Sequence, residues 1–395
     1  MGALDGIRVV EAGLLVQGPQ AAATLGEWGA DVIKVELPFF GDQSRWIPVA
    51  HGDGRAPYFI GCNRGKRSIT IDLRVPDGRE LFLQLTEGAD VVITNFKPGT
   101  MESWRLGFAE LSERNPGIVF ATGSAFGPVG PDAEREGTDL SAQASGGLIS
   151  ATGRDGSEPT PVAVTIADHI ASQNLVAGVL AALVARGRTG RGQQVDVSLL
   201  GGQIWAQASE YTYHLLTGAL PGRPNRGHPL IAGVYGIFPT SDGWMAIPGV
   251  VGNERTRFFH TIGAPQLLDD PRFAAPLLKM DDKLALFEEI GKVFSTRTTD
   301  EWCTALRAAG HRFAPVRTYD DVVADPQAWE NGYITRTTDA SGNEVTTVGS
   351  PIRLSDTPTR VIADVPELGQ HTEEVLLEAG FSWDDIEGLR TTGAI

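Results

Sequence analysis

"IRVVEAGLLVQGPQAAATLGEWGADVIKVE", residues 7–36, has the pattern of one strand–helix–strand unit. Residues 7–13 are a short apolar run typical of a buried strand, and residues 31–36 have the same character. Between them, residues 19–29 predict a helix with a proline early in it and a glycine at its end. This order favours a parallel pair of strands joined by a crossover helix.

The same alternation continues along the first third of the chain. Residues 67–73, 90–96 and 117–126 predict further strands, and residues 76–89 predict a helix between two of them. Repeated units of this kind form a parallel sheet with helices on both faces. We therefore expect an α/β fold with a Rossmann-like layer.

The sequence beyond residue 215 has a different pattern. Residues 216–229 are rich in Gly and Pro and predict a linker. Residues 230–325 predict a second, smaller domain of α/β or α+β type, which begins with a strand pair that turns at residues 241–243. A strand from about residue 344 and a helical tail follow.

Charge and hydropathy narrow the classes of function. The formal charge is 33 − 49 = −16 at pH 7, which argues against nonspecific binding to nucleic acid or to an anionic membrane. The longest apolar run, residues 175–185, is shorter than the ~20 residues of a transmembrane helix. The N-terminus has no basic region of a signal peptide. Two basic runs, residues 64–67 and 186–191, could hold a small anionic ligand.

The cysteines and histidines show no metal or redox pattern. Cys62 and Cys303 are the only cysteines, which favours a reducing cytoplasm over a disulfide framework. The seven histidines have no ligand spacing, and we expect no metal site.

Two long irregular segments, residues 37–66 and 127–139, follow predicted strands and are candidates for the functional site. The turn after the first strand contains Gly13 and Gly18 but no G-x-G-x-x-G. Glu36 ends the second strand, where dinucleotide enzymes carry a ribose-binding acid. The missing glycine pattern nevertheless disfavours a nicotinamide cofactor.

Asp168 stands between an apolar, strand-like run and a long apolar helix. It can be an ordinary N-cap, whose carboxylate accepts backbone N–H bonds and contributes ~1 kcal/mol. It can also be a functional carboxylate, which the helix N-terminus would keep ionised at neutral pH and which could act as a nucleophile or a base. The spacing alone leaves both interpretations open.

Seven stretches along nearly the whole chain, taken in order, resemble the class III CoA-transferase family, which comprises the formyl-CoA:oxalate and carnitine CoA-transferase type and α-methylacyl-CoA racemase. They are "LDGIRVVEAG" (4–13), "GPQAAATLGEWGADVIKVE" (18–36), "CNRGKRSITIDL" (62–73), "DVVITNFKPGTMESWRLGF" (90–108), "GTDLSAQASGGLISATG" (137–153), "IADHIASQNLVAGVLAALVARGRTGRGQQVDVSLL" (166–200) and "LGQHTEEVLLEAGF" (368–381).

The resemblance implies an interlocked homodimer. Each chain would build a large Rossmann-like domain from residues 1–215 and 346–395. The linkers at 216–229 and 326–345 would join that domain to the small domain at 230–325.

The resemblance also implies the chemistry. CoA would move from an acyl-CoA thioester to a free carboxylic acid, with Asp168 as nucleophile, through an aspartyl anhydride and an aspartyl-CoA thioester. The substrates would be acyl-CoA and a carboxylic acid, with no metal. Glycines of the small domain would help to cover the site, with Gly227, Gly233 and Gly236 as candidates. The residues implied to bind CoA are Gln17, Arg74, Asn95, Phe96, Lys97 and Arg105.

The sequence also departs from its relatives. A glutamine of the formyl-CoA type falls at Val16, one position before Gln17, and an arginine that stacks on adenine falls at Leu37. The racemase branch pairs its aspartate with the histidine of a "GHD" segment, where this chain has Thr138. His169 adjoins Asp168, but the next residue of a helix points elsewhere.

Racemisation needs two groups that exchange protons on opposite faces of a carbon, so losing one of them favours transfer. An acyl-CoA racemase or epimerase remains the first alternative. A nicotinamide-binding or non-enzymatic Rossmann protein is the second.

Overall fold

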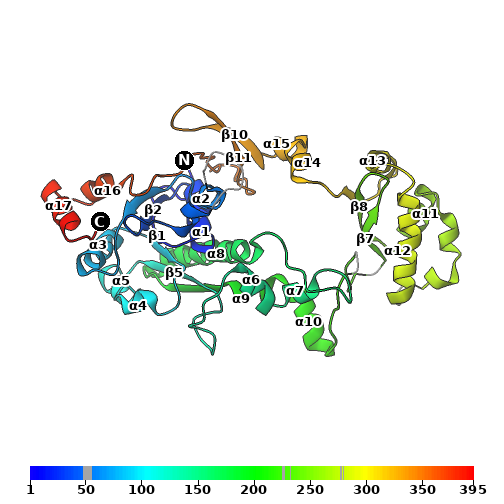
Figure 1. Cartoon of the computed structure of the whole chain (residues 1–395), viewed down its shortest axis with the longest axis horizontal. Helices are drawn as coiled ribbons and strands as arrows, with labels where there is room; N and C mark the ends of the chain where they lie inside the picture. Colours follow the sequence, from blue (N-terminus) through cyan, green and yellow to red (C-terminus); the bar gives the residue numbers. More distant parts are fainter. Residues whose placement is uncertain (48–55, 225–226, 232, 276–277, 279) are drawn as a thin grey trace. The chain divides into compact units, whose positions relative to one another are not determined.

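The structure is a computed structural model, and the chain divides into two compact units (Figure 1). The first unit consists of Met1–Gly146, Ala163–Ala206 and Pro326–Ile395, and the second of Gly147–Val162 and Gln207–Asp325. The residues described are 1–47, 56–224, 227–231, 233–275, 278 and 280–395.

A six-stranded parallel sheet forms the centre of the first unit, which confirms the expected α/β fold. Its strand order is β3-β2-β1-β4-β5-β6, so the order reverses between β1 and β4. The strands are β1 (Arg8–Ala12), β2 (Asp31–Glu36), β3 (Arg67–Thr70), β4 (Val91–Thr94), β5 (Val119–Ser124) and β6 (Gln194–Ser198).

Apolar residues on both faces of each central strand explain why helices cover both sides of the sheet. Val9 lies in register with Val91, and both face a layer formed by α1 (Gln17–Glu27) and α8 (Ile166–Thr189). Their neighbours Val10 and Val92 face the opposite layer. That layer contains α3 (Pro76–Glu87), α5 (Phe108–Arg114), α16 (Thr372–Glu378) and α17 (Trp383–Thr391).

The C-terminal segment returns to the large sheet beside β3, although some 300 residues of sequence separate them. The backbone N–H of His371 donates to the carbonyl oxygen of Ser68 at 2.8 Å, and that of Thr70 donates to Thr372 Oγ1 at 3.1 Å. Val375 and Leu376 of α16 then complete the core on that face. Pro326–Ile395 is thus a structural part of the first unit.

Helix α8 is 24 residues long, or about 36 Å, and connects β5 to β6 across the sheet. Among the described helices it is the one that is long and apolar enough to cross a membrane by length and composition. One of its faces, with Leu175, Val176 and Val179, packs on the sheet as a core helix does. Gly190, in the left-handed region at φ 70°, ends the helix.

The second unit has its own sheet and core. Strands β7 (Val234–Pro239) and β8 (Trp244–Val250) form the expected pair, which turns at residues 240–243, and β9 (Ala314–Pro315) adds a short third strand. Phe238, Phe258, Phe294 and Trp302 fill the core. The remaining helices of this unit are α7 (Leu148–Ala151), α10 (Ala208–Thr217), α11 (Glu254–Thr261), α12 (Met280–Phe294), α13 (Thr299–Ala308) and α14 (Tyr319–Val323).

Two of the glycines proposed to cover the site have structural reasons of their own. Gly227 pairs with Gly236 across an isolated bridge, and an added Cβ at Gly227 would lie 2.2 Å from the carbonyl oxygen of Tyr235. Gly233 is in the left-handed region at φ 79°, with the carbonyl oxygen of Val250 at 2.3 Å from an added Cβ. Close approach of the neighbouring backbone at both positions, together with the left-handed backbone of Gly233, therefore explains why glycine stands there.

Three expectations from the sequence are wrong, and a fourth is wrong at one boundary. The run before Asp168, residues 159–165, forms no strand. The expected linker at 326–345 contains helix α15 (Pro326–Glu330) and strand β10 (Ile334–Thr338), which pairs with β11 (Glu344–Val348). Residues 147–162, expected in the first domain, belong to the second unit. The expected linker at 216–229 begins within α10, and its residues 225–226 lie outside the described part of the chain.

Candidate active site

The N-termini of α1 and α8 meet at the carboxyl edge of the sheet, where the strand order reverses. This edge is the usual ligand site of open parallel sheets. The ring Nδ1 of His169, in the first turn of α8, contacts Gln20 Oε1, in the first turn of α1. The two helix starts therefore lie side by side, and Asp168 stands next to that contact.

Asp168 is not the N-cap of α8, so the N-cap interpretation is wrong. The N-cap position is Thr165, and Asp168 is the third residue of the helix. Another carboxylate performs the capping, because Asp139 Oδ1 accepts the backbone N–H of Ala167 at 2.6 Å and that of Asp168 at 3.3 Å. Asp139 begins helix α6 (Asp139–Ser145), directly after the long loop at 127–139.

The environment of Asp168 raises its pKa to about 7, first because burial removes water from the carboxylate and second because the charge of Asp139 is close. At neutral pH its carboxyl group is therefore partly protonated, whereas the helix N-terminus by itself was expected to keep it ionised. Within the described part of the chain, no hydrogen bond is made to its carboxylate. Asp168 is thus a half-buried, weakly solvated carboxylate with an unusually basic oxygen.

Gln17 lies in the first turn of α1 and is 3% exposed. Its amide packs against Gly123 at the end of β5, where an added Cβ would lie 2.5 Å from Gln17 Oε1. Gln17 Nε2 is buried and has no hydrogen-bond partner among the described residues. A buried donor of this kind costs free energy unless another group accepts from it. This is the property expected of a group that binds a ligand.

The loop between β1 and α1 is held by side chains from two other segments. Asn95 Oδ1 accepts the N–H of Leu14 at 2.7 Å, and Asn95 Nδ2 donates to the Leu14 carbonyl at 2.8 Å. Leu15, at φ 63°, donates its N–H to Asp42 Oδ1 at 3.0 Å. The amide of Asn95 therefore positions the loop that carries Gln17, and this structural use was not foreseen from the sequence.

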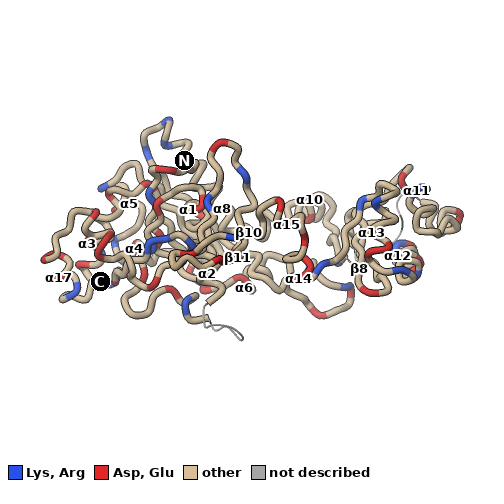
Figure 2. The backbone as a smooth tube through the Cα atoms, turned by 90° about the horizontal axis from the view of Figure 1, so that it is seen from above, with Lys and Arg blue, Asp and Glu red and all other residues tan. Residues whose placement is uncertain are grey.

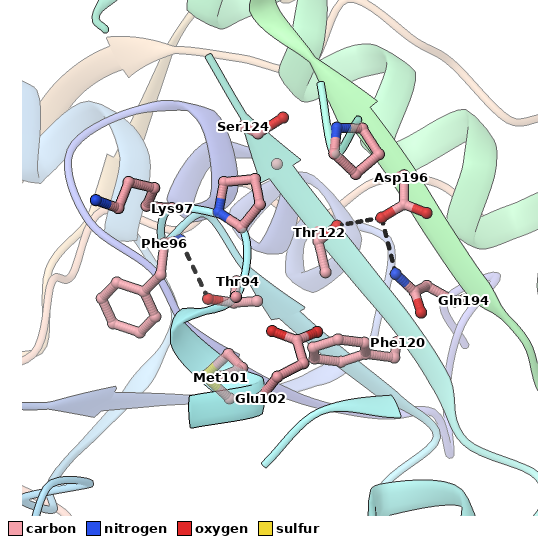
Figure 3. Close-up of a pocket in the computed structure, with 14 residues that line it drawn as sticks. Thr94, Phe96, Lys97, Met101, Glu102, Phe120, Thr122, Ser124, Gln194 and Asp196 are labelled. Carbon is pink, nitrogen blue, oxygen red and sulfur yellow. Dashed lines mark hydrogen bonds between the residues drawn. The ribbon is translucent and has the colours of Figure 1, made fainter. Parts of the chain in front are cut away.

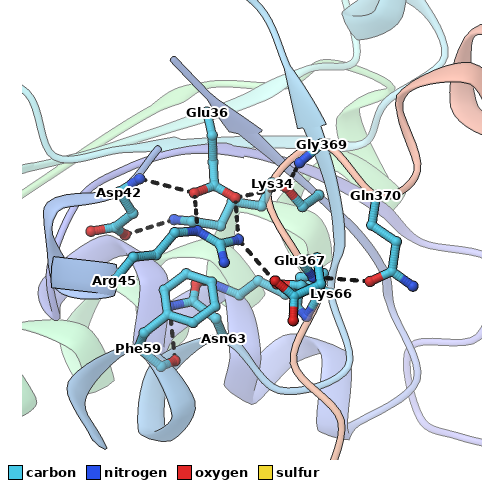
Figure 4. A network of polar contacts seen from close by, with 12 residues as sticks. Lys34, Glu36, Asp42, Arg45, Phe59, Asn63, Lys66, Glu367, Gly369 and Gln370 are labelled. Atoms are coloured by element: carbon cyan, nitrogen blue, oxygen red, sulfur yellow. Dashed lines mark hydrogen bonds and ion pairs between the residues drawn. The ribbon is translucent and has the colours of Figure 1, made fainter. Parts of the chain in front are cut away.

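A buried cluster of charges lies behind this loop (Figure 4). Lys34 Nζ contacts Glu11 Oε2 at 3.2 Å and Asp42 Oδ2 at 2.9 Å, and all three side chains are inaccessible to solvent. Burial lowers the pKa of Lys34, but the charges of Glu11, Asp42 and Glu36 outweigh it and raise the pKa above its ordinary value. No sequence pattern indicated this cluster, because Glu11, Lys34 and Asp42 come from three separate segments of the first unit.

The basic run at 64–67 belongs to structural ion pairs, so the expectation that it holds an anionic ligand is wrong. Lys66 is buried against Glu11 at 3.0 Å, and burial lowers its pKa to about 8. Arg64 pairs with Glu27, and Arg67 pairs with Asp31 and with two glutamates of α16. Basic and acidic residues are interspersed in the same way over the rest of this unit (Figure 2).

A cavity of about 350 Å³ opens at the carboxyl ends of β1, β2 and β3. Phe96, Trp104, Trp46 and Leu37 give it largely apolar walls, and Arg74 lies at its boundary. The guanidinium of Arg74 is exposed and pairs with Asp72 at 2.7 Å. The cavity thus combines flat apolar surfaces with a cation, as a nucleotide requires.

A second cavity, of about 160 Å³, lies over β4, β5 and β6 (Figure 3). Phe96 lines both cavities, and Lys97 lies on the same loop. On the floor of the second cavity, Asp196 Oδ1 accepts from Thr122 Oγ1 at 2.7 Å and from Gln194 Nε2 at 2.9 Å. Phe96 and Lys97 are therefore next to a polar site.

Arg105 lines neither cavity. Its side chain is exposed, and its guanidinium has no partner among the described residues. The backbone has φ 58°, a conformation that costs an arginine about 1 kcal/mol or more. It follows Trp104, a wall residue of the larger cavity, so its charge is near that cavity but not inside it.

Comparisons with known proteins agree with these features. The sequence profile of CoA-transferase family III matches residues 4–372. The succinate–glutarate CoA-transferase of Agrobacterium fabrum is 34% identical over 95% of this chain and 95% of that protein. The succinyl-CoA–D-citramalate CoA-transferase of Chloroflexus aurantiacus is 33% identical over 99% of this chain and 98% of that protein. A crystal structure of a CaiB/BaiF family protein from Brucella suis has a TM-score of 0.84 at 35% identity, covering 96% of this chain and 99% of that one.

Proposed function

The chain belongs to CoA-transferase family III, as its sequence motifs predicted, and from this premise we propose that Asp168 is the covalent nucleophile of the transfer. The observation that carries this proposal is the carboxylate itself. Asp168 is half-buried, has a raised pKa and accepts no hydrogen bond from the described residues, at the start of a long helix. A weakly solvated carboxylate is a far better nucleophile than one in water.

The transfer divides into balanced steps. A carboxylate oxygen of Asp168 attacks the thioester carbon, the C–S bond breaks, and CoA leaves as thiolate while a mixed anhydride forms. The thiolate then attacks the Asp168 carbonyl carbon, which releases the donor acid as carboxylate and leaves an aspartyl-CoA thioester. The acceptor carboxylate then attacks the carbonyl carbon of the aspartyl-CoA thioester, which expels CoA thiolate and forms a second mixed anhydride. The thiolate attacks the acceptor's acyl carbon in that anhydride, which gives the new acyl-CoA and releases the Asp168 carboxylate with no net change of oxidation state.

For CoA we propose a position along the carboxyl edge of the sheet. The adenine would pack among the apolar walls of the larger cavity. This chain has Leu37 where the formyl-CoA type has an arginine that stacks on adenine, and Trp46 and Phe96 offer flat surfaces instead. The phosphates would meet Arg74, Lys97 and Arg105, whose positive charges suit them. Gln17 Nε2, with its unused hydrogen, would face the thioester end.

We propose dicarboxylic acids as the substrates. Two relatives that match nearly the whole chain are named for succinate and glutarate and for succinyl-CoA and D-citramalate. Succinyl-CoA is therefore the first donor to test, with C4 to C6 dicarboxylic acids as acceptors.

The same family also includes racemases, but one observation favours transfer. The residue at the place of the racemase histidine, Thr138, uses its hydroxyl to cap α6, where it and Ser141 make reciprocal bonds. A capping hydroxyl has no basicity at neutral pH and is a poor second base. Loss of optical activity from a chiral 2-methylacyl-CoA without any acceptor acid would instead support the racemase.

The test of function is a panel of acyl-CoA donors crossed with carboxylic acids. We expect a new CoA ester to form only when donor and acceptor are both present, and mass spectrometry of the products identifies it. Hydrolysis of the acyl-CoA thioester to CoA and free acid without transfer, for every pair in the panel, would contradict the proposal.

We also propose that the large unit is a Rossmann-like CoA-binding domain and that the enzyme is a homodimer. Large apolar side chains of the single chain support a partner copy, because Trp205 is 75% exposed and Leu215, Leu216 and Leu220 are each 80% exposed. Light scattering should give the mass of two chains, and a mass of one chain at micromolar concentration would contradict the dimer.

Arg105→Ala should raise the KM for acyl-CoA about tenfold and leave kcat nearly unchanged. One charge-assisted hydrogen bond to a phosphate contributes ~1.5 kcal/mol, equally in the ground and transition states. Steady-state kinetics measure both constants, and Arg114→Ala, which removes an exposed arginine of α5, serves as the control. A fall in kcat at constant KM would place Arg105 in the chemistry instead.

A further inference from the structure

The start of α8 is held from outside by Asp139. The first backbone N–H groups of a helix have no partner within the helix, and here Asp139 Oδ1 accepts two of them, from Ala167 and Asp168. Its other oxygen accepts from Gln143 Nε2 at 2.6 Å. Asp139 is 8% exposed, so both of its oxygens are used inside the protein.

One of these two hydrogen bonds comes from Asp168, the proposed nucleophile. The N–H of Asp168 donates to Asp139, which fixes the backbone from which the Asp168 carboxylate projects. The two carboxylates then lie close together in a site with little water. Two negative charges in such a place repel each other, and this repulsion adds to the effect of burial on Asp168.

We propose that Asp139 is a positioning residue for the transfer, which holds the first turn of α8 and supplies the negative charge that faces Asp168. The inference rests on the nucleophilic role proposed for Asp168. Acylation turns the Asp168 carboxylate into a neutral anhydride or thioester. The repulsion from Asp139 is therefore present before the attack and absent after it, so it raises the free energy of the resting carboxylate relative to the intermediate.

Among the described residues, the other elements packed around Asp168 bring no comparable charge. Helix α1 contributes the neutral amides of Gln17 and Gln20, and α2 (Pro57–Asn63) contributes Cys62, whose pKa burial raises to about 11. Helix α9 (Leu199–Ala206) and strand β5 have no ionisable residue. On α8 itself, burial lowers the pKa of His169, which favours its neutral form.

Two further charged residues, Asp196 of β6 and Lys66 before β3, each already have partners. Asp196 accepts from Thr122 and Gln194 at the second cavity. Lys66 is paired with Glu11. Within the described residues, Asp139 is thus the charged group that faces Asp168.

The substitution Asp139→Asn tests whether the charge of Asp139 matters in addition to the N–H bonds that it accepts from α8. Asparagine is as good a cap as aspartate, because its Oδ1 can accept the same two N–H bonds, but it has no charge. The rate of acylation of Asp168 by succinyl-CoA in a single turnover, followed by mass spectrometry from pH 5 to pH 9, should rise with pH through a midpoint near pH 7 in the wild type. In Asp139→Asn we expect that midpoint to fall by about one pH unit.

Thr138→Ala is the matched control. It removes the neighbouring side chain, which caps α6 and makes no bond to α8, so the midpoint should stay at its wild-type value. If Asp139→Asn fails to fold, Asp139→Ser carries the same test, because its hydroxyl also accepts N–H bonds and has no charge.

The outcomes distinguish the inference from the function on which it rests. A wild type that forms no adduct on Asp168 contradicts the nucleophilic role itself. An adduct that forms with an unmoved midpoint in Asp139→Asn, and in Asp139→Ser, contradicts the role of Asp139 and leaves that of Asp168 intact. A midpoint that falls in both variants and stays in Thr138→Ala supports the inference.

Discussion

Asp168→Asn should abolish CoA transfer, with a loss of at least ~10⁴ in kcat. The amide cannot form the anhydride, and removing a nucleophile from a covalent mechanism commonly costs this much or more. The substitution preserves size and leaves the bonds from Ala167 N and Asp168 N to Asp139 in place. Transfer from succinyl-CoA to glutarate, measured for equal amounts of folded enzyme, checks the loss.

A trapping experiment accompanies that rate. Wild-type enzyme incubated with acyl-CoA and no acceptor should form an adduct on the peptide that contains Asp168, and hydroxylamine should convert it to a hydroxamate. The corresponding peptide of the Asp168→Asn variant should remain unmodified. An active variant would overturn the mechanism, and an inactive variant from a wild type that forms no adduct would favour the racemase.

The same variant should be more stable than the wild type at pH 8. The pKa of Asp168 is higher in the folded chain, at about 7, than its ordinary value of 3.8, so the folded state binds the extra proton between these values. Stability therefore falls as pH rises through that window. The whole shift in pKa corresponds to a loss of ~4 kcal/mol in the free energy of unfolding of the wild type. Because the carboxylate is not fully buried, we expect a loss of about 2 kcal/mol.

Denaturation at two pH values measures this gain. Asp168→Asn should unfold at higher urea concentration than the wild type at pH 8, and the difference should shrink at pH 5. Equal stability at both values would show that Asp168 is well solvated, which contradicts the environment proposed for the nucleophile.

Local patterns predicted the central strands of the sheet well because these strands are apolar on both faces. Residues 31–36 were expected as a strand, and β2 has these bounds. The helix expected at 76–89 ends at Glu87, because Gly88 follows as its C-cap. Where a strand does not pack on a hydrophobic core, its sequence lacks the apolar pattern that predicts a strand. Ile334–Thr338 is mostly polar, and only its pairing with β11 makes it a strand.

The candidate site was partly predictable for a related reason. Motifs that are continuous in sequence led to Asp168 and to Phe96, which lines both cavities. Asp139 was within a quoted motif, but only its neighbour Thr138 drew notice there. Its bond to α8 joins residues 28 apart, and no periodicity shows such a contact. The only available signal was an acid next to a helix start.

The buried charges could not be predicted at all, yet they bear on the same site. Lys34 and Glu11 lie in strands whose other residues are mostly apolar and buried. From the sequence alone, nothing shows that each of the two charges has a buried partner of opposite sign. Asp42 links the cluster to the loop that carries Gln17, through the N–H of Leu15. The buried ion pairs thus help to fix the position of the loop that carries Gln17 at the candidate active site.

Lys34→Met should therefore destabilise the fold strongly, by ~3–5 kcal/mol. The network consists of three carboxylates and three cations, so its net charge is 3 − 3 = 0. They are Glu11, Glu36 and Asp42, and Lys34, Arg45 and Lys66. Removing Lys34 leaves a net charge of −1 in a place that water does not reach. An unpaired buried charge costs this much because desolvation is no longer offset. Methionine keeps the length and apolar character of the stem, so packing changes little. Lys97→Met, on the exposed loop, is the control and should change stability by less than ~0.5 kcal/mol.

A second substitution should rescue part of the loss. Asp42→Asn removes the charge left behind, while its Oδ1 can still accept the N–H of Leu15, so Lys34→Met with Asp42→Asn restores neutrality. We expect the double variant to be more stable than Lys34→Met alone, with a coupling free energy of ~1–3 kcal/mol in urea denaturation. The double variant should also bind acyl-CoA more tightly than Lys34→Met alone, because the loop that carries Gln17 regains its support. Additive losses from the two substitutions would mean that Lys34 and Asp42 act independently and that the loop is held in another way.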